Sequence, residues 1–268
     1  MDSGRIREKM KTPTNICHVV RFTDNTAYLY FLGCGWKCKA CLRLMGWDNH
    51  IPPGDIKSLN KNYPDKTKLK LTIGDAVKIL KDNNAKKLYL GGYEPTADPN
   101  IEKILKVLKD NGFLVKVVTN GEFLNERIME SVDEVTLSIK ALDDEIHRAY
   151  TGVSNRGTLK NFERFHNSEK LEVESIFIPG LVECEEILKI AAHIANYNKN
   201  LRYRLDRFYS CNGYKRSATE EEVECCLKKV MEILPNAYTF KFKKGRSDYA
   251  RCLYPKLLKK VLSKKRLD

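Results

Sequence analysis

The chain has 268 residues, 42% of them hydrophobic, and its 48 lysines and arginines against 35 acidic residues give a formal net charge of +13. This length and composition allow a sizeable buried core and favour one large α/β domain over residues 1–268, rather than two small domains. No run approaches the roughly 18 apolar residues of a membrane span, so no membrane association is expected. The charge excess permits an anionic partner such as RNA but is equally common in thermophilic proteins.

Short β-type runs alternate with helical patterns about six times, which is typical of parallel βα units. Strands are expected at residues 27–32, 87–90, 114–119, 134–139, 171–178 and 201–208. A Thr72 to Asp75 capping box predicts the start of one helix, and Asn111-Gly112 predicts the end of another. Such units form either a barrel or an open sheet, and in both the chemistry gathers at the carboxyl ends of the strands.

Three cysteines, Cys34, Cys38 and Cys41, lie directly after the first expected strand. Zinc would need a fourth protein ligand, and no second pair follows at finger or ribbon spacing. A disulfide framework is not expected in a chain of this length whose start, residues 1–11, is charged rather than leader-like. Three thiolates on one short loop instead predict an iron-sulfur cluster with one iron left open. Reduced cysteines and a cytoplasmic location are expected with it.

Alternation within two strands predicts a polar inner face. Thr136, Ser138 and Lys140 alternate with apolar residues, and Arg202, Arg204 and Asp206 do the same in the last expected strand. A strand buried on both faces should be apolar throughout. These polar residues therefore indicate either a lumen that holds a ligand, with Arg204 as a candidate catalytic residue, or strands at a rim whose charges face water.

Taken together, the later motifs resemble those of the radical S-adenosylmethionine (SAM) enzymes, and in particular the glycyl-radical activating enzymes of the pyruvate formate-lyase type. The resemblance covers about residues 16–215, with an extension over about 216–268. Its segments are the cysteine motif, Gly91-Gly92-Tyr93-Glu94-Pro95-Thr96, Thr119-Asn120-Gly121, Ser138-Ile139-Lys140, Asp143 to Arg148, Thr151-Gly152 and Asn155.

The resemblance implies a partial (β/α)6 barrel with a C-terminal helical extension. It implies a 4Fe-4S cluster on Cys34, Cys38 and Cys41, and SAM bound at the open iron. Reductive cleavage of SAM would give methionine and a 5′-deoxyadenosyl radical that attacks a substrate. A protein substrate, a flavodoxin or ferredoxin type electron donor and anaerobic chemistry are expected with it.

The resemblance also implies the residues that hold SAM. The cofactor-binding set is Gly91, Gly92, Tyr93, Glu94, Asn120, Ser138, Lys140 and Pro179, and Lys140, Tyr209 and Arg204 are the candidate catalytic residues. Glycine lets the backbone approach a ligand closely. Val118 and Ser138 replace two acids of activating enzymes, so their monovalent-cation site is expected to be absent.

Other features have simpler interpretations. His147 is interpreted as a structural histidine on an exposed helix. Cys184, Cys211, Cys225, Cys226 and Cys252 match no cluster or zinc spacing, and Cys226 lies on an apolar helix face. Residues 254–266 predict a closing helix with solvated lysines or an RNA contact. Residues 47–70 are a candidate cap over the site.

Three functions remain open from the sequence. The first is activation of a partner enzyme through a backbone glycine. The second is radical modification of RNA, another protein or a small molecule. The third is a non-enzymatic redox or scaffold protein that carries the cluster.

Overall fold

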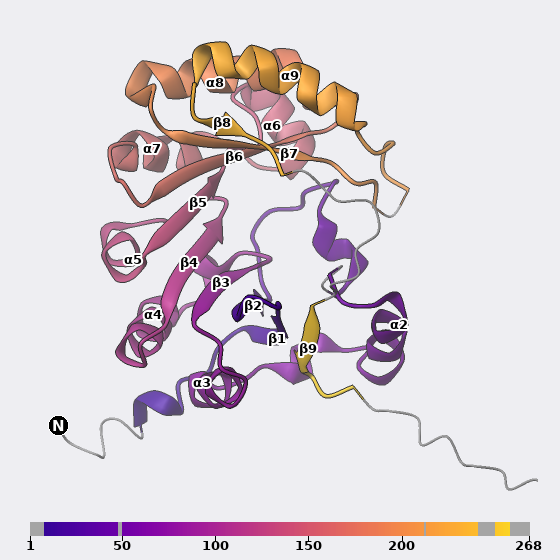
Figure 1. Ribbon diagram of the computed structural model, residues 1–268, viewed down its shortest axis with the longest axis vertical. Coiled ribbons are helices and arrows are strands. Elements are labelled where there is room, and N and C mark those ends of the chain that lie inside the picture. The colour runs from indigo at the N-terminus through magenta and orange to yellow at the C-terminus, as the bar shows by residue number, and fades with distance from the viewer. Residues whose placement is uncertain (1–7, 48–49, 212, 241–249, 258–268) are drawn as a thin grey trace, which may run out of the picture.

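The computed structural model describes residues 8–47, 50–211, 213–240 and 250–257. Within these ranges the strands form one sheet in the order β8-β7-β6-β5-β4-β3-β2-β1-β9 (Figure 1). The strands are β1 (Ile16–Arg21), β2 (Thr26–Phe31), β3 (Lys87–Gly92), β4 (Leu114–Thr119), β5 (Glu134–Ser138), β6 (Leu171–Phe177), β7 (Arg202–Arg207), β8 (Ala237–Tyr238) and β9 (Arg251–Tyr254). Pairing is parallel from β2 through β8, and β1 is antiparallel to both β2 and β9.

The helices follow the outer side of the curved sheet, except for α2, which lies at the open side of the sheet near β9 (Figure 1). They are α2 (Pro53–Asn62), α3 (Ile73–Asp82), α4 (Ile101–Asp110), α5 (Glu126–Ser131), α6 (Asp144–Thr151), α7 (Arg156–Phe165), α8 (Cys184–Asn198) and α9 (Glu220–Ile233), with 3-10 turns η1 (Leu42–Met45), η2 (Lys66–Leu69) and η3 (Pro95–Ala97). The six parallel strands β2 to β7 confirm the predicted repeat and form an α/β partial barrel. No described helix is long and apolar enough to cross a membrane.

Local signals in the sequence set several of these boundaries. The predicted capping box is present, because Thr72 accepts from the backbone N–H of Asp75 and the Asp75 side chain accepts in return. After α4, Gly112 adopts a left-handed φ of +82°, as the Asn111-Gly112 pair predicts. The same conformation at Gly152 ends α6.

The two faces of the sheet differ in chemistry. Val135 and Leu137 of β5 are fully buried in the core beneath the outer helices. The alternate residues, Thr136 and Ser138, face the inner side, as the alternation predicted. Arg204 lies on the same inner side with only 11% of its side chain exposed, whereas Arg202 is 59% exposed, so Arg204 is enclosed on the inner side and Arg202 faces solvent.

Strands β1 and β9 form an edge that the local sequence pattern did not predict. The helix predicted over residues 254–266 is wrong at Tyr254, which belongs to strand β9 and pairs with Val19 of β1. Residues 258–266 of that prediction lie outside the described residues. The period of apolar residues there suits a helix, but the free edge of β1 offers backbone partners to residues 251–254. Pairing across more than 200 residues overrides that local pattern.

The segment 47–70 is not an open loop. It folds into α2 and η2, and its Trp47, Ile51 and Leu59 are buried in a second hydrophobic cluster with Val20 and Tyr30. This segment therefore packs against β1 and β2 and forms a separate small hydrophobic core with them.

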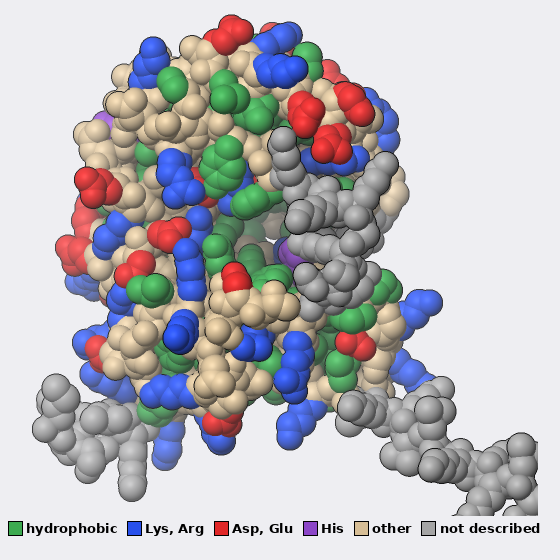
Figure 2. All heavy atoms as spheres, viewed as in Figure 1, with side chains coloured by type: hydrophobic (Ala, Val, Ile, Leu, Met, Phe, Trp, Pro, Cys, Tyr) green, Lys and Arg blue, Asp and Glu red, His purple; other side chains and the backbone are tan. Residues whose placement is uncertain are grey.

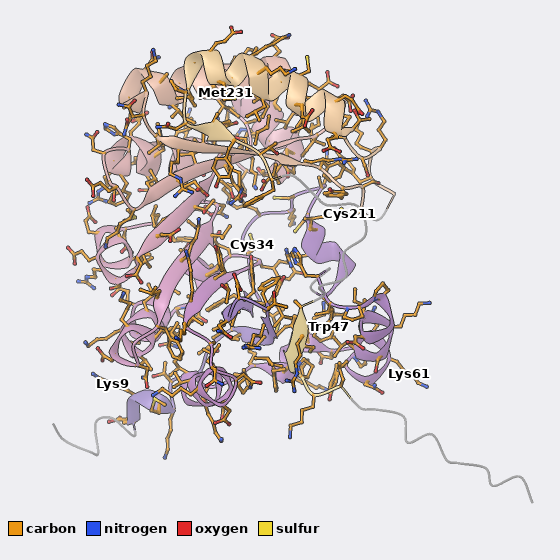
Figure 3. The ribbon with its side chains drawn as sticks, in the orientation of Figure 1. Lys9, Cys34, Trp47, Lys61, Cys211 and Met231 are labelled. Atoms are coloured by element: carbon orange, nitrogen blue, oxygen red, sulfur yellow. A yellow bond between two sulfur atoms is a disulfide. The ribbon has the colours of Figure 1, made fainter. Side chains whose placement is uncertain are left out.

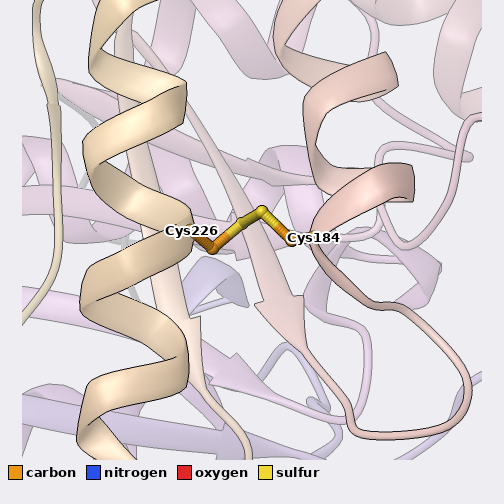
Figure 4. The surroundings of a disulfide bond; sticks show 2 residues. All are labelled: Cys184 and Cys226. Carbon is orange, nitrogen blue, oxygen red and sulfur yellow. A yellow bond between two sulfur atoms is a disulfide. The ribbon is translucent and has the colours of Figure 1, made fainter.

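The expectation that all cysteines stay reduced or bind metal is wrong for one pair. Cys184 at the start of α8 and Cys226 within α9 form a disulfide, with Cα atoms 5.4 Å apart (Figure 4). The two helices pack side by side over β6 and β7, which brings the thiols within the range that a disulfide needs. Cys226 is 1% exposed, as its apolar helix face predicted.

Candidate active site at the carboxyl ends of the strands

The three clustered cysteines lie on the loop between β2 and η1, each of them partly buried. Backbone N–H groups of Lys37 and Lys39 donate to the carbonyls of Thr151 (2.8 Å) and Tyr150 (2.9 Å) at the end of α6. The N–H of Cys41 donates to the carbonyl of Cys38 at 3.3 Å. The loop is therefore held in shape against α6.

Trp36, between the first two cysteines, anchors the same loop. Its indole Nε1 donates to Glu122 Oε2 at 2.7 Å, and its ring stands edge-on to His147 with centroids 5.0 Å apart. His147 is fully buried rather than exposed, and its Nδ1 lies 2.8 Å from the carbonyl of Val153. Its position supports the structural interpretation.

Two N–H groups are directed at the sulfur of Cys34. They are the backbone N–H of Trp36, at 3.4 Å, and the side-chain amide of Asn120, at 3.9 Å. Asn120 follows β4, so the turn after one strand contacts the cysteine that follows another. Cys211, after β7, donates to the carbonyl of Cys41 at 3.6 Å, and Figure 3 shows Cys34 and Cys211 on the inner side of the sheet.

Burial raises the pKa of Cys34 and raises that of Cys38 to about 11, although the charge of Lys140 opposes the change at Cys38. Within the described ranges, no three His, Cys, Asp or Glu side chains are close enough to share one metal ion. The donor set itself, three soft thiols on one braced loop with N–H donors beside a sulfur, fits an iron-sulfur cluster.

Glu94 joins the ends of β3 and β4. Its carboxylate is 1% exposed and accepts from the N–H and hydroxyl of Thr96, the hydroxyl of Thr119 and the N–H of Asn120, at 2.6–3.0 Å. Burial raises its pKa, although these hydrogen bonds oppose the change. Its backbone N–H donates to the carbonyl of Gly33 at 3.0 Å, next to Cys34. The side chain of Glu94 is thus a brace that positions Asn120 and the cysteine loop.

The glycine pair at the end of β3 is required by packing. A Cβ on Gly91 would collide with the hydroxyl of Tyr28, and Gly92 adopts a φ of +98° against the backbone of Phe31. Tyr93 is 37% exposed, and its N–H donates to the carbonyl of Phe31 at 3.0 Å. The space above Gly91, in which a close approach of SAM was expected, holds the Tyr28 phenol.

Lys140 and Ser138 meet a charged network on the inner face. Ser138 Oγ donates to Glu174 Oε1 at 2.5 Å, and Lys140 Nζ lies 3.6 Å from the same carboxylate. Arg204 forms an ion pair with Glu174 and contacts Asp206 at 2.9 Å. The candidate residues of β5 and β7 therefore converge on Glu174.

Two candidates lie farther along the same edge. Pro179 is buried in the turn after β6, and Tyr209 follows β7 with the guanidinium of Arg207 5.2 Å from its ring centroid. The sequence reasoning did not identify Tyr28, Glu122 or Glu174 as site residues. Alternation places Tyr28 and Glu174 on the inner faces of β2 and β6 and could have found them, but nothing local marks Glu122.

A family model described as the radical SAM superfamily matches residues 28–194. The chain belongs to the radical SAM superfamily. Membership implies a 4Fe-4S cluster and SAM, and the braced cysteine loop lies within the matched region.

Two similar proteins are both named as activating enzymes. The chain is 26% identical over 209 residues to a Methanocaldococcus jannaschii protein named as a candidate glycyl-radical enzyme activating enzyme, covering 76% of this chain and 74% of that one. It is 26% identical over 178 residues to the pyruvate formate-lyase-activating enzyme of Clostridium pasteurianum, covering 65% and 69%.

The fold resembles that of Streptococcus suis SuiB. The SuiB structure bound to its precursor peptide SuiA matches with a TM-score of 0.55 and 15% identity, over 89% of this chain and 52% of SuiB. The structure bound to SAM matches with a TM-score of 0.55 and 16% identity, over 81% and 46%. The chain thus spans about half the length of SuiB, and this likeness concerns the fold.

Proposed function

We propose that the protein is an enzyme that cleaves SAM reductively and uses the resulting radical to modify a protein or peptide, in the manner of a glycyl-radical activase. The observation that carries the proposal is the loop of Cys34, Cys38 and Cys41 at the carboxyl end of β2. This loop is held by backbone hydrogen bonds and lies beside Asn120, in the turn after β4. The activating-enzyme relatives and the peptide complex of SuiB favour a polypeptide substrate.

The cysteines Cys34, Cys38 and Cys41 would hold three irons of a 4Fe-4S cluster. When bound, such a cluster supplies one electron to the SAM sulfonium, and the C5′–S bond breaks to give methionine and a 5′-deoxyadenosyl radical. A flavodoxin or ferredoxin type donor is the proposed source of the electron.

The protein's own residues position these groups. Lys140 lies near Cys38 and carries the positive charge that suits the methionine carboxylate of SAM. The amide of Asn120 and the backbone of Trp36 surround Cys34, and the loop containing Trp36 is fixed by Glu122.

The proposal is tested by anaerobic reconstitution with iron and sulfide, followed by dithionite and SAM, with 5′-deoxyadenosine as the product measured. A Cys38→Ala variant should form none, whereas Cys225→Ala, an exposed cysteine outside the loop, should match the parent. Absence of 5′-deoxyadenosine from the parent would favour the redox or scaffold function instead. With a candidate partner enzyme, electron paramagnetic resonance should then detect a glycyl radical, and its absence would reject the activase.

RNA modification is a second candidate, favoured by the net charge of +13. Exposed lysines of α3 and α4 nevertheless pair with aspartates one turn away, as in Lys78 with Asp82 at 2.6 Å and Lys106 with Asp110 at 3.2 Å. RNA retention that falls steeply between low and physiological salt would support this candidate. Retention unchanged on removal of residues 258–268 would show that the basic tail is not the contact.

A further inference from the structure

Helices α8 and α9 are joined by the Cys184–Cys226 bond on the outer side of β6 and β7 (Figure 4). Figure 2 shows the molecule hollowed between the part that holds β3 and the part that holds β7, and this pair of helices covers the outer side of the second part (Figure 1). Acidic residues on either side of Cys184 accept hydrogen bonds from two turns at the carboxyl edge of the sheet. The first turn of α8 is therefore connected both to α9 and to the edge at which the candidate SAM residues lie.

Glu186 lies two residues after Cys184, in the first turn of α8, and is 3% exposed. Its Oε1 accepts the backbone N–H groups of Leu142 and Asp143 at 2.7 and 2.8 Å. Both residues belong to the turn between β5 and α6, which also contains Lys140. A buried carboxylate on α8 thus holds the turn that carries Lys140, through hydrogen bonds of the strong, charge-assisted kind.

Glu183, directly before Cys184, holds a second turn. Its Oε1 accepts the N–H of Gly180 at 2.7 Å, in the turn after β6 that also contains Pro179. Glu183 is the N-cap residue of α8, but its side chain makes this contact instead of capping the helix. The two acids beside Cys184 therefore each hold a turn that carries a predicted SAM residue.

The first turn of α8 depends on the disulfide more than the rest of the helix does. The start of a helix leaves N–H groups that a side-chain cap usually satisfies. In α9 a capping box of Thr219 and Glu222 does so, whereas the N-cap side chain of α8 is engaged elsewhere. Beyond the first turn, Ile187 and Ile190 are fully buried in the core. Packing therefore holds the body of α8, and the bond from Cys184 ties its uncapped start to α9.

We propose that Glu183 and Glu186 are positioning residues for the SAM site and that the Cys184–Cys226 bond makes their hold redox-sensitive. With the bond intact, the turns of Lys140 and Pro179 are held firmly, and reduction of the bond loosens both. Reduction adds two electrons and two protons to the disulfide and gives two thiols, while a dithiol is oxidised to its own disulfide. This inference rests on the proposed function for the identity of SAM as the ligand, whereas its first test requires neither cluster nor SAM.

Hydrogen exchange of the full-length chain, followed by mass spectrometry, measures how firmly the turns are held. After dithiothreitol reduces the pair, the amides of Leu142, Asp143 and Gly180 should exchange about fivefold or more faster, because their acceptors lie on a turn that now frays. Peptides from the body of α8, residues 187–194, should exchange as before. Unchanged exchange at the three amides would overturn the proposal, as would equal acceleration throughout α8.

Cysteine variants assign the effect to this pair. Cys184→Ser should exchange rapidly at both turns without dithiothreitol and should not respond to it. Cys225→Ser, which changes the exposed neighbour of Cys226, should respond as the parent does. Slow exchange in Cys184→Ser that circular dichroism shows to be folded would overturn the proposal.

Variants of the two acids separate the two turns. Glu186→Ala should accelerate exchange at Leu142 and Asp143 and leave Gly180 protected, whereas Glu183→Ala should do the reverse. Glu186→Gln should retain most of the protection, because its amide oxygen can accept the same two N–H groups. Protection that survives both alanine substitutions would overturn the positioning role.

Affinity for SAM connects the turns to the site. Equilibrium dialysis without an electron donor compares the reconstituted parent, with its bond shown to be intact by alkylation and mass spectrometry, with reconstituted Cys184→Ser. The parent should bind SAM about fivefold or more tightly, because its two turns are already ordered. Equal affinities would overturn the proposal. Absence of SAM binding from both proteins would reject the proposed function instead, and the exchange comparison would still decide whether the pair controls the turns.

Discussion

The hydroxyl of Tyr28 occupies the position that a side chain on Gly91 would take. The two residues lie on the adjacent parallel strands β2 and β3. Gly91 pairs with Tyr30, and Tyr28, two residues before Tyr30, pairs with Tyr89. The absence of a side chain at Gly91 therefore lets the Tyr28 ring lie along the inner face of the sheet, near the end of β2 where the cysteine loop begins.

Gly91→Ala should destabilise the protein by about 1–3 kcal/mol, because an inserted methyl group in a packed site forces the backbone or the Tyr28 ring to shift. Urea unfolding measures the effect. Gly54→Ala, in α2 with open space around the new methyl group, should be neutral or slightly stabilising. In a Tyr28→Ala background the penalty of Gly91→Ala should largely disappear, and a full penalty there would show that the phenol is not its cause.

Glu122→Ala should weaken retention of iron by the reconstituted protein. Glu122 accepts the indole N–H of Trp36 at 2.7 Å, and a hydrogen bond to a charged acceptor contributes about 1.5–3 kcal/mol to holding the loop. Iron per chain after gel filtration is the measurement, with Glu130→Ala on the exposed side of α5 as the matched control. Equal iron content in the two variants would mean that the loop is fixed without this contact.

Asp133→Asn should lower stability by about 1–2 kcal/mol at pH 7, after allowance for solvent screening. Asp133 contacts Lys109 at 2.5 Å and accepts the N–H of Val115 at 2.7 Å. Burial alone would raise its pKa, but these contacts outweigh burial and lower it. Because the folded-state pKa is depressed, the stabilisation is present above the ordinary aspartate pKa and is lost as pH falls through the folded value.

The difference between parent and Asp133→Asn should therefore shrink on acidification, as measured by urea unfolding at neutral and strongly acidic pH. Asp82→Asn, which removes an exposed pair on α3, should change stability by less than about 0.5 kcal/mol at either pH. A difference for Asp133→Asn that is constant with pH would contradict the role of its charge.

Cys184→Ser should lower stability by about 2–4 kcal/mol under oxidising conditions, because the bond to Cys226 constrains the unfolded chain between α8 and α9. Under a phosphine reductant the parent and the variant should unfold at nearly the same denaturant concentration. Cys225→Ser changes the exposed neighbour of Cys226 and should have no effect under either condition. Mass spectrometry after alkylation checks that the parent lacks two reactive thiols when oxidised.

The sequence predicted the features that depend on neighbouring residues. The box at Thr72 and Asp75, the left-handed Gly112 and the cysteine loop after β2 each rest on a few consecutive positions. The six parallel strands followed from the same kind of local pattern. What was missed depends on pairing across the chain. The edge formed by Val20 and Cys252 and the bond from Cys184 to Cys226 have no signal within either segment.

The site shows the same division. The motif residues could be named in advance, but the role of Glu94 depends on Thr119 and Asn120, which reach it only when β3 and β4 are adjacent. The alternation in β7 indicated an inner Arg204 with Asp206 on the same face, whereas its partners Glu172 and Glu174 could not be assigned without the register between β6 and β7. Local sequence thus identifies donors and ligands, and long-range register decides which of them meet.

The sheet remains an arc whose two outermost strands, β8 and β9, both come from residues 237–254. Strand β8 pairs with β7 beside the charged residues of the inner face, and β9 pairs with β1 beside the second hydrophobic cluster. A single short stretch near the C-terminus therefore supplies both margins of the unclosed side. The residues that border the open side of the sheet can therefore be changed at β8 and β9 without altering the cysteine loop, which lies between β2 and η1.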